Sequence, residues 1–210
     1  MKQEQDSQPR RLIVGISGAS GVIYGVRALE MLREAGVETH LVMSRAAELT
    51  LACETDYKPR QVEALASVVH APANIGASIA SGSFQTAGML VLPCSTKTMS
   101  EIACGITSTL LTRAADVVLK ERRRLVLGLR ETPLHTGHLR NMTQVSEIGA
   151  IIAPIVPAFY TNPASIQDII DHSVGRLLEL FDIDTGTVRR WQGPPRKSAS
   201  NTDNQTGEPT

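Results

Sequence analysis

Two short segments of this sequence carry the groups that a bound phosphate needs. Residues 15–21 read GISGASG, where small side chains let the backbone approach a ligand closely. Residues 95–98 read STKT and supply three hydroxyls and one cation. Each segment leads into a predicted helix, whose first N–H groups are free to bind an anion. The two segments together predict a phosphate site, with a tight turn for the first and simple N-capping for the second as the alternatives.

The absence of two known nucleotide-binding patterns limits which nucleotides this sequence is expected to bind. Residues 15–21 do not follow the G-x-G-x-x-G spacing of dinucleotide sites, and residues 95–98 lack the Walker A frame. Ser44 ends a predicted strand at the place where a dinucleotide site carries an acidic residue for the ribose. We therefore expect a mononucleotide rather than NAD.

Further charged groups offer a second anion site and proton transfer. Arg113 and Lys120 are seven residues apart, so they share one face of a predicted helix, although a solvated basic face is the alternative. Arg130 and Glu131 follow a predicted strand directly. The five histidines show no metal-binding spacing and are expected to be structural. No aspartate-rich segment is present to hold magnesium on a diphosphate, so we expect no metal site.

Alternating strands and helices must position these groups. Apolar, β-branched runs predict strands at 11–17, 39–44, 88–94, 125–129 and 150–156. Helical patterns cover 22–34, closed by Gly36, and then 45–53, a stretch from 99, 108–123, 135–148 and 165–181, whereas 57–82 shows no clear pattern. This alternation predicts an α/β fold with a doubly wound, mostly parallel sheet. In such a sheet the strand carboxyl ends share one rim, where residues 18–21, 44, 95–98 and 130–131 would meet.

Composition limits the partners and the compartment. Lys+Arg and Asp+Glu number 21 each, so no overall charge attracts nucleic acid or an anionic membrane. Three cysteines without paired spacing favour a reducing, cytoplasmic compartment, and no apolar run reaches the roughly 20 residues that span a bilayer. We expect a flexible extension at residues 1–10, one domain at 11–192 and a disordered tail at 193–210.

Several motifs closely resemble the flavin prenyltransferases of the UbiX type. They are GISGASGVIYGVRALEML, ETD at 54–56, PCSTKTMS, LLTRAADVVLKERR, LRETPLH and PAFY, spread over residues 11–191. The resemblance implies a flavodoxin-like, Rossmann-like three-layer sandwich that assembles as dodecamers of trimers, with active sites at subunit interfaces. It implies an enzyme that joins dimethylallyl monophosphate to reduced FMN at N5 and C6 without a metal. The prenylated FMN would serve a UbiD-type decarboxylase in ubiquinone biosynthesis or aromatic acid metabolism.

The same resemblance assigns roles to individual positions. FMN contacts fall on Gly18, Ala19, Ser20, Ser44, Ser95, Thr96, Lys97, Thr98 and Arg130. Prenyl-phosphate contacts fall on Lys120, Arg130, Tyr160 and Arg176, and acid–base candidates on Glu131, Glu54 and Ser20. Trp191 matches an aromatic residue that covers the site. Lys97 is a departure, because many members have glycine there, and it leaves the geometry of that turn in question.

The chemistry suggests how these residues work, and it leaves rivals to test. Fixed cations can stabilise a departing phosphate without a metal, and Glu131 is the best candidate for proton transfer. The alternatives are an ion pair between Glu131 and Arg130, solvent exposure for Arg176 and loop packing for Tyr160. Rival functions are a flavin-dependent decarboxylase of peptidyl or pantothenoyl cysteine, a non-catalytic carrier of prenylated flavin, and direct decarboxylation of an aromatic acid.

Overall fold

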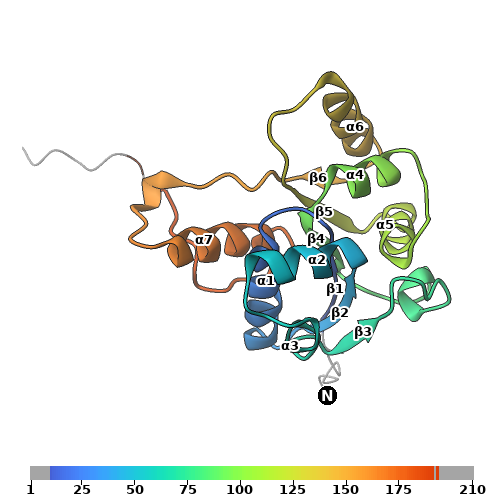
Figure 1. The fold of residues 1–210 in the computed structure, drawn as a ribbon, viewed down its shortest axis with the longest axis horizontal. Coiled ribbons are helices and arrows are strands. Elements are labelled where there is room, and N and C mark those ends of the chain that lie inside the picture. The colour runs from blue at the N-terminus through green and yellow to red at the C-terminus, as the bar shows by residue number, and fades with distance from the viewer. Residues whose placement is uncertain (1–9, 192, 194–210) are drawn as a thin grey trace, which may run out of the picture.

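The computed structural model describes residues 10–191 and 193, and Figure 1 shows their fold. The extension expected at 1–10 and the tail expected at 193–210 lie outside the described residues, apart from Arg10 and Gly193. Six parallel strands form one sheet in the order β3-β2-β1-β4-β5-β6. Their bounds are β1 Arg11–Ile16, β2 Glu38–Met43, β3 Val68–His70, β4 Gly88–Cys94, β5 Arg124–Leu129 and β6 Ile151–Ile152.

Helices connect the strands and cover both faces of the sheet (Figure 1). The α-helices are α1 Val22–Glu34, α2 Arg45–Glu54, α3 Pro59–Glu63, α4 Thr96–Ala103, α5 Leu110–Lys120, α6 Thr136–Glu147 and α7 Ile166–Glu179. Two short 3-10 helices are η1 Ser78–Ala80 and η2 Phe159–Thr161. No helix in the described part of the chain is long and apolar enough to cross a membrane.

Successive residues of each strand enter two different hydrophobic cores. In β1, Leu12, Val14 and Ile16 pack with α1 and α7, whereas Ile13 packs with α4 and α5 on the other face. Side chains of a strand point alternately to the two faces, so a strand covered on both must be apolar throughout. This explains the continuous apolar runs and confirms the predicted three-layer α/β fold.

The strand order fixes where a ligand can bind. From β1 the chain winds one way through β2 and β3, and then the other way through β4, β5 and β6. The loops after β1 and β4 therefore diverge at the point where the winding reverses, which leaves a crevice at the strand carboxyl ends. The predicted rim of ligand-binding segments thus has its centre between β1 and β4.

The structure corrects three predicted elements. The strand β3 lies in the stretch without a clear pattern, where a three-residue edge strand leaves too short a signal. β6 holds only two of the residues predicted at 150–156, although the amides of Ala153 and Ile155 still donate to the carbonyls of Leu127 and Leu129 in β5. Helix α4 begins at Thr96 rather than at 99, since Ser95 caps it and residues 96–98 form its first turn.

Candidate active site

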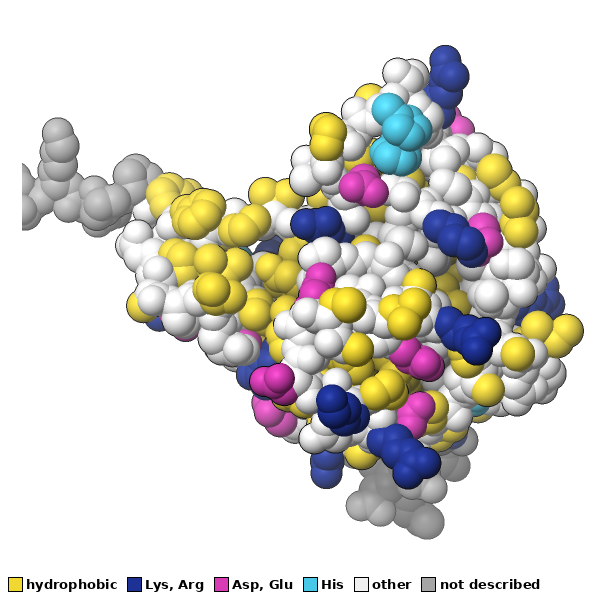
Figure 2. Space-filling view, in the orientation of Figure 1, with side chains coloured by type: hydrophobic (Ala, Val, Ile, Leu, Met, Phe, Trp, Pro, Cys, Tyr) yellow, Lys and Arg dark blue, Asp and Glu magenta, His cyan; other side chains and the backbone are white. Residues whose placement is uncertain are grey.

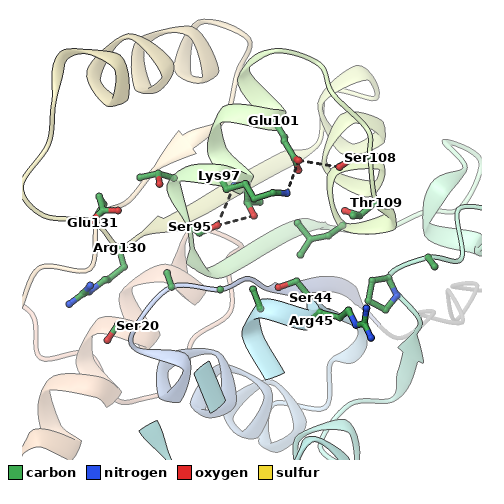
Figure 3. Close-up of a pocket in the computed structure, with 18 residues that line it drawn as sticks. Ser20, Ser44, Arg45, Ser95, Lys97, Glu101, Ser108, Thr109, Arg130 and Glu131 are labelled. Atoms are coloured by element: carbon green, nitrogen blue, oxygen red, sulfur yellow. Dashed lines mark hydrogen bonds and ion pairs between the residues drawn. The ribbon is translucent and has the colours of Figure 1, made fainter. Parts of the chain in front are cut away.

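A cavity of about 660 Å³ lies at the carboxyl edge of the sheet (Figure 3). Its volume falls in the range of about 300–1,000 Å³ that is typical of small-molecule sites. The cavity is lined by every residue assigned to FMN by resemblance, namely Gly18, Ala19, Ser20, Ser44, Ser95, Thr96, Lys97, Thr98 and Arg130. Glu131 lines it too, together with Arg45, Glu101, Ser108 and Leu111, which the sequence patterns did not single out.

The close approach of two loops shapes the floor of this cavity. A Cβ placed on Gly18 would lie 2.3 Å from the Cβ of Ala46, so only glycine lets the loop after β1 lie against the start of α2. On the far side, the Arg130 amide donates to the carbonyl of Cys94 over 3.1 Å and ties the end of β5 to the end of β4. Packing between neighbouring strand ends thus brings the predicted segments together.

Two helices begin at the cavity and supply anion-binding groups. The hydroxyl of Ser44 accepts a 3.1 Å hydrogen bond from the amide of Ala47, and Ser95 caps α4 in the same way through Thr98. These two hydroxyls therefore serve the helices themselves, and for Ser95 this is the N-capping alternative that the sequence left open. The first amides of α2 and α4 have no partner within their helices and line the cavity at the positive end of each helix dipole. The STKT segment thus caps a helix and also offers amides to an anion.

The start of α1 is different, and one expectation about it is wrong. The amides at its start are not free to bind a phosphate. The Glu54 carboxylate accepts hydrogen bonds from the amide of Gly21 over 2.8 Å and from the amide of Val22 over 3.2 Å. Burial alone would raise the pKa of Glu54, but hydrogen bonds from Ser20, Gly21 and Val22 and the charge of Arg130 outweigh it and lower the pKa. Glu54 therefore stays ionised at neutral pH, so it can accept a proton but has none to donate.

A charged cluster at one wall of the cavity involves a residue that the sequence patterns missed. The Lys97 ammonium lies 2.7 Å from the Glu101 carboxylate, which also accepts a 3.1 Å hydrogen bond from Ser108 (Figure 3). Glu101 follows Lys97 by four residues on α4, a spacing that brings side chains together on a helix and was the available signal. Lys97 thus stands in the first turn of a regular helix with its charge partly neutralised.

Arg130 and Glu131 reach the cavity from the end of β5. Arg130 lies at the same end of the cavity as Ser20, whereas Arg45 lies at the opposite end (Figure 3). One carboxylate oxygen of Glu131 accepts a 2.9 Å hydrogen bond from the amide of Thr132. Among the ion pairs of the described residues, none joins Arg130 to Glu131, so the structure does not support the ion-pair alternative.

Within one chain the remaining predicted residues lie outside this cavity. Lys120, at the end of α5, pairs with Glu121 over 2.6 Å. Tyr160 and Arg176 line a separate cavity of about 290 Å³, and Arg176 pairs with Glu179. Trp191 packs edge to face on Tyr160, with ring centroids 5.8 Å apart, and does not line the main cavity. A single chain therefore does not gather the cations into one cluster.

The sheet is parallel and doubly wound, and helices begin at the point where its winding reverses. The residue after β2 is Ser44 rather than an acidic residue. These features define a protein of the mononucleotide-binding, flavodoxin-like class. The Flavoprotein family model matches residues 1–190. The chain is 62% identical to the flavin prenyltransferase UbiX of Escherichia coli K12, over 88% of this chain and 99% of that protein. It belongs to the flavoprotein family and, within it, to the UbiX-type flavin prenyltransferases.

Two solved structures agree with this placement. AnUbiX (PadA1), in complex with FMN and dimethylallyl pyrophosphate, is 54% identical with a TM-score of 0.88, over 89% of this chain and 99% of that one. The dodecameric FMN-dependent UbiX-like decarboxylase of Escherichia coli O157:H7 is 51% identical with a TM-score of 0.85, over 87% of this chain and 100% of that one.

Proposed function

We propose that this protein is a flavin prenyltransferase that joins dimethylallyl monophosphate to reduced FMN, with new bonds at N5 and C6. The observation that carries the proposal is the main cavity, where all nine residues assigned to FMN meet. Family membership at 62% identity supports the same activity. The reaction breaks the allylic C–O bond, phosphate leaves with the electron pair, and N5 loses its proton as it bonds to the allylic carbon. Ring closure then adds one proton to the prenyl alkene and removes one from C6.

The residues of the cavity fit FMN. The first amides of α2 and α4, with the hydroxyl of Thr96, are suited to its phosphate, and the small residues 18–20 leave room beside it. FMN supplies the electron-rich ring that accepts the prenyl group. Arg130 lies at the end of the cavity near Ser20, and we propose that it contacts both that ring and the prenyl phosphate.

Stabilisation of the departing phosphate needs residues from more than one copy of the chain. Lys120, Tyr160 and Arg176 lie outside the cavity that holds Arg130. We propose that neighbouring subunits present these groups to it, in an assembly of trimers that is dodecameric, as the Escherichia coli relative is. Arginine is suited to paired phosphate contacts and lysine to a point charge, so the assembled set can stabilise the leaving group without a metal.

Proton transfer is assigned mainly to Glu131. Its carboxylate is exposed to the cavity and has only one backbone hydrogen bond, from Thr132. Glu54 is already committed to the start of α1, and its lowered pKa leaves it without a proton at neutral pH. We therefore propose Glu131 as the main acid–base residue, with Glu54 and Ser20 supporting it through their hydrogen bond.

One experiment tests the reaction. The protein is incubated anaerobically with FMN, a reductant and either dimethylallyl monophosphate or dimethylallyl diphosphate. The mass of the released flavin is then measured by mass spectrometry. We expect a mass gain of one prenyl unit with the monophosphate and little with the diphosphate, which departs with more negative charge for the fixed cations to stabilise. An unchanged flavin mass with both donors would contradict transferase activity and favour a carrier.

A mixing experiment tests the shared site. Arg130→Ala and Arg176→Ala should each inactivate the enzyme, because each removes a cation from every site. If the two residues come from different subunits, mixed oligomers of the two variants regain some complete sites and part of the activity. An inactive mixture, with subunit exchange verified by mass spectrometry, would place both residues in the same copy.

The destination of the product is proposed from the family resemblance. We propose that the prenylated FMN is the cofactor of a UbiD-type decarboxylase, in ubiquinone biosynthesis or aromatic acid metabolism, within the cytoplasm. The isolated protein should then release no carbon dioxide from an aromatic acid, but should activate such a decarboxylase when FMN and the prenyl donor are added. Release of carbon dioxide by the protein alone would instead support the rival function, direct decarboxylation of an aromatic acid.

A further inference from the structure

The side chain of Tyr160 lies against a buried histidine to which neither the sequence patterns nor the resemblance assigned a role. His172 lies in the middle of α7 and is only 6% exposed. Its Nε2 is 3.4 Å from the Tyr160 hydroxyl, and the two rings meet edge to face with centroids 5.8 Å apart. A histidine nitrogen at this distance can set which way the phenolic hydrogen points.

The segment that carries Tyr160 is fixed against α7 from the other side. It belongs to an arm that leaves the sheet after β6 and returns to the start of α7 (Figure 1). The Arg189 guanidinium donates to the carbonyl of Thr161 over 2.9 Å. A Cβ on Gly175 would lie 2.4 Å from the hydroxyl of Thr187, so the missing side chain lets residues 185–188 lie on α7. The partners of Tyr160 are therefore held in place.

This arm exposes a large apolar surface around Tyr160. Figure 2 shows hydrophobic side chains gathered on the projecting part of the molecule, where Val156, Phe159 and Trp191 are mostly exposed. Tyr160 lies between the buried ring of His172 and the ring of Trp191. Its hydroxyl is thus the polar tip of an aromatic group, with His172 as its hydrogen-bonding neighbour.

His172 also shares a cavity wall with a proposed phosphate contact. His172 and Arg176 are four residues apart on α7, so they lie on one face of the helix. Both line the cavity of about 290 Å³, together with Tyr160. Much of the remaining wall is apolar, including Ala153, Ile155 and Leu177. Arg176 itself pairs with Glu179, which also accepts a 2.7 Å hydrogen bond from Arg190.

We propose that His172 is a positioning residue for Tyr160. With a proton on Nε2, His172 donates to the phenolic oxygen and leaves the Tyr160 O–H free to donate to the departing phosphate. In the opposite arrangement the phenol donates to His172 and turns a lone pair toward the phosphate, which is repulsive. His172 itself transfers no proton and touches no substrate. The inference rests on the proposed function, because it requires that Tyr160 contact the prenyl phosphate.

The test compares two replacements of His172 in the full-length enzyme. His172→Leu removes the donor and should lower kcat/KM for dimethylallyl monophosphate by about 2- to 12-fold, the range of one net hydrogen bond, with FMN affinity unchanged. His172→Gln places an amide nitrogen near the position of Nε2 and should restore most of the loss. If the leucine variant does not fold, His172→Asn, whose amide is too short to reach Tyr160, takes its place.

A double-mutant cycle separates positioning from a structural role. In a Tyr160→Phe background, His172→Leu should produce no further loss of kcat/KM, because the hydroxyl that it orients is absent. The matched control is Gln167→Leu, an exposed position on the same helix, which should leave kcat/KM unchanged. An equal loss in the phenylalanine background, or a glutamine variant as impaired as the leucine one, overturns the inference.

The same set of variants distinguishes a failure of the positioning role of His172 from a failure of the proposed function or of the role of Tyr160. If the wild-type protein makes no prenylated flavin, the proposed function fails. If Tyr160→Phe leaves kcat/KM unchanged, the assignment of Tyr160 to the phosphate fails. If Tyr160→Phe is impaired while His172→Leu is not, only the positioning role is overturned.

Discussion

The hydroxyl of Ser17 accepts a 2.8 Å hydrogen bond from the amide of Ser95. The same hydroxyl donates to the carbonyl of Pro93 over 2.9 Å, and Ser17 is only 1% exposed. One buried side chain therefore joins the loop after β1 to the loop after β4, which form two sides of the main cavity. The geometry of the site depends on this link as much as on the residues that line it.

Ser17→Ala should destabilise the fold and loosen the cavity. The change leaves the amide of Ser95 without a partner, which costs about 1–3 kcal/mol of unfolding free energy, whereas the carbonyl of Pro93 keeps its 3.2 Å hydrogen bond from the amide of Ser17. FMN should bind more weakly because the two loops are held together by fewer hydrogen bonds. Chemical denaturation and a fluorescence titration with FMN measure the two effects. The exposed Ser146→Ala serves as control, and equal stabilities of the two variants would contradict the link.

Glu54→Gln should reduce stability in a pH-dependent way. The folded pKa of Glu54 lies below its ordinary value, so the ionised carboxylate stabilises the fold. That stabilisation is complete above the unfolded pKa of about 4.3 and is lost as the pH falls through the lower folded pKa. The stability difference between wild type and variant should therefore shrink as the pH is lowered from about 6 to 3.

Denaturation curves across that pH range measure the difference directly. The matched control is Glu147→Gln, an exposed position on α6, whose difference from wild type should stay flat. A difference for Glu54→Gln that stays constant or grows toward acid would show that the carboxylate does not hold the start of α1 in its charged form.

Glu101→Gln should tighten FMN binding. Glu101 lines the cavity and pairs with Lys97, so its charge both repels a bound phosphate and offsets the lysine. Its neutral replacement leaves Lys97 free to attract the phosphate, and we expect a several-fold lower Kd for FMN at low salt. The gain should fade as added salt screens the charges. An unchanged or higher Kd would mean that Glu101 acts mainly by holding Lys97 and Ser108 in place.

Glu131→Gln should slow product formation and leave binding intact. General acid–base catalysis typically contributes about 10²–10⁴-fold, so a loss of that order is expected under single-turnover conditions. The Kd for FMN should change little, because Glu131 is not among the residues assigned to FMN. Mass spectrometry of the released flavin follows the rate. A wild-type rate in the variant would mean that Glu54, Ser20 or the phosphate itself carries out the proton transfer.

The sequence alone determined the fold class and most of the main site. Strands buried on both faces need continuous apolar runs, so β1, β4 and β5 are legible from local composition. The loops after such strands must meet at one rim, so chain order and the handedness of the crossovers are enough to bring Gly18, Ser44 and Arg130 together. The three-residue edge strand β3 is too short to leave a pattern, whereas β6 was predicted but with too many residues.

Only the tertiary structure decided which partner each polar group takes. Glu54 follows Gly21 by 33 residues and His172 follows Tyr160 by 12, and no local spacing predicts either contact. The structure also shows that Lys120, Arg176 and Arg130 lie in three different places within one chain. Hydrogen bonds and ion pairs act over a few ångströms, and packing sets those distances between segments that the sequence keeps far apart.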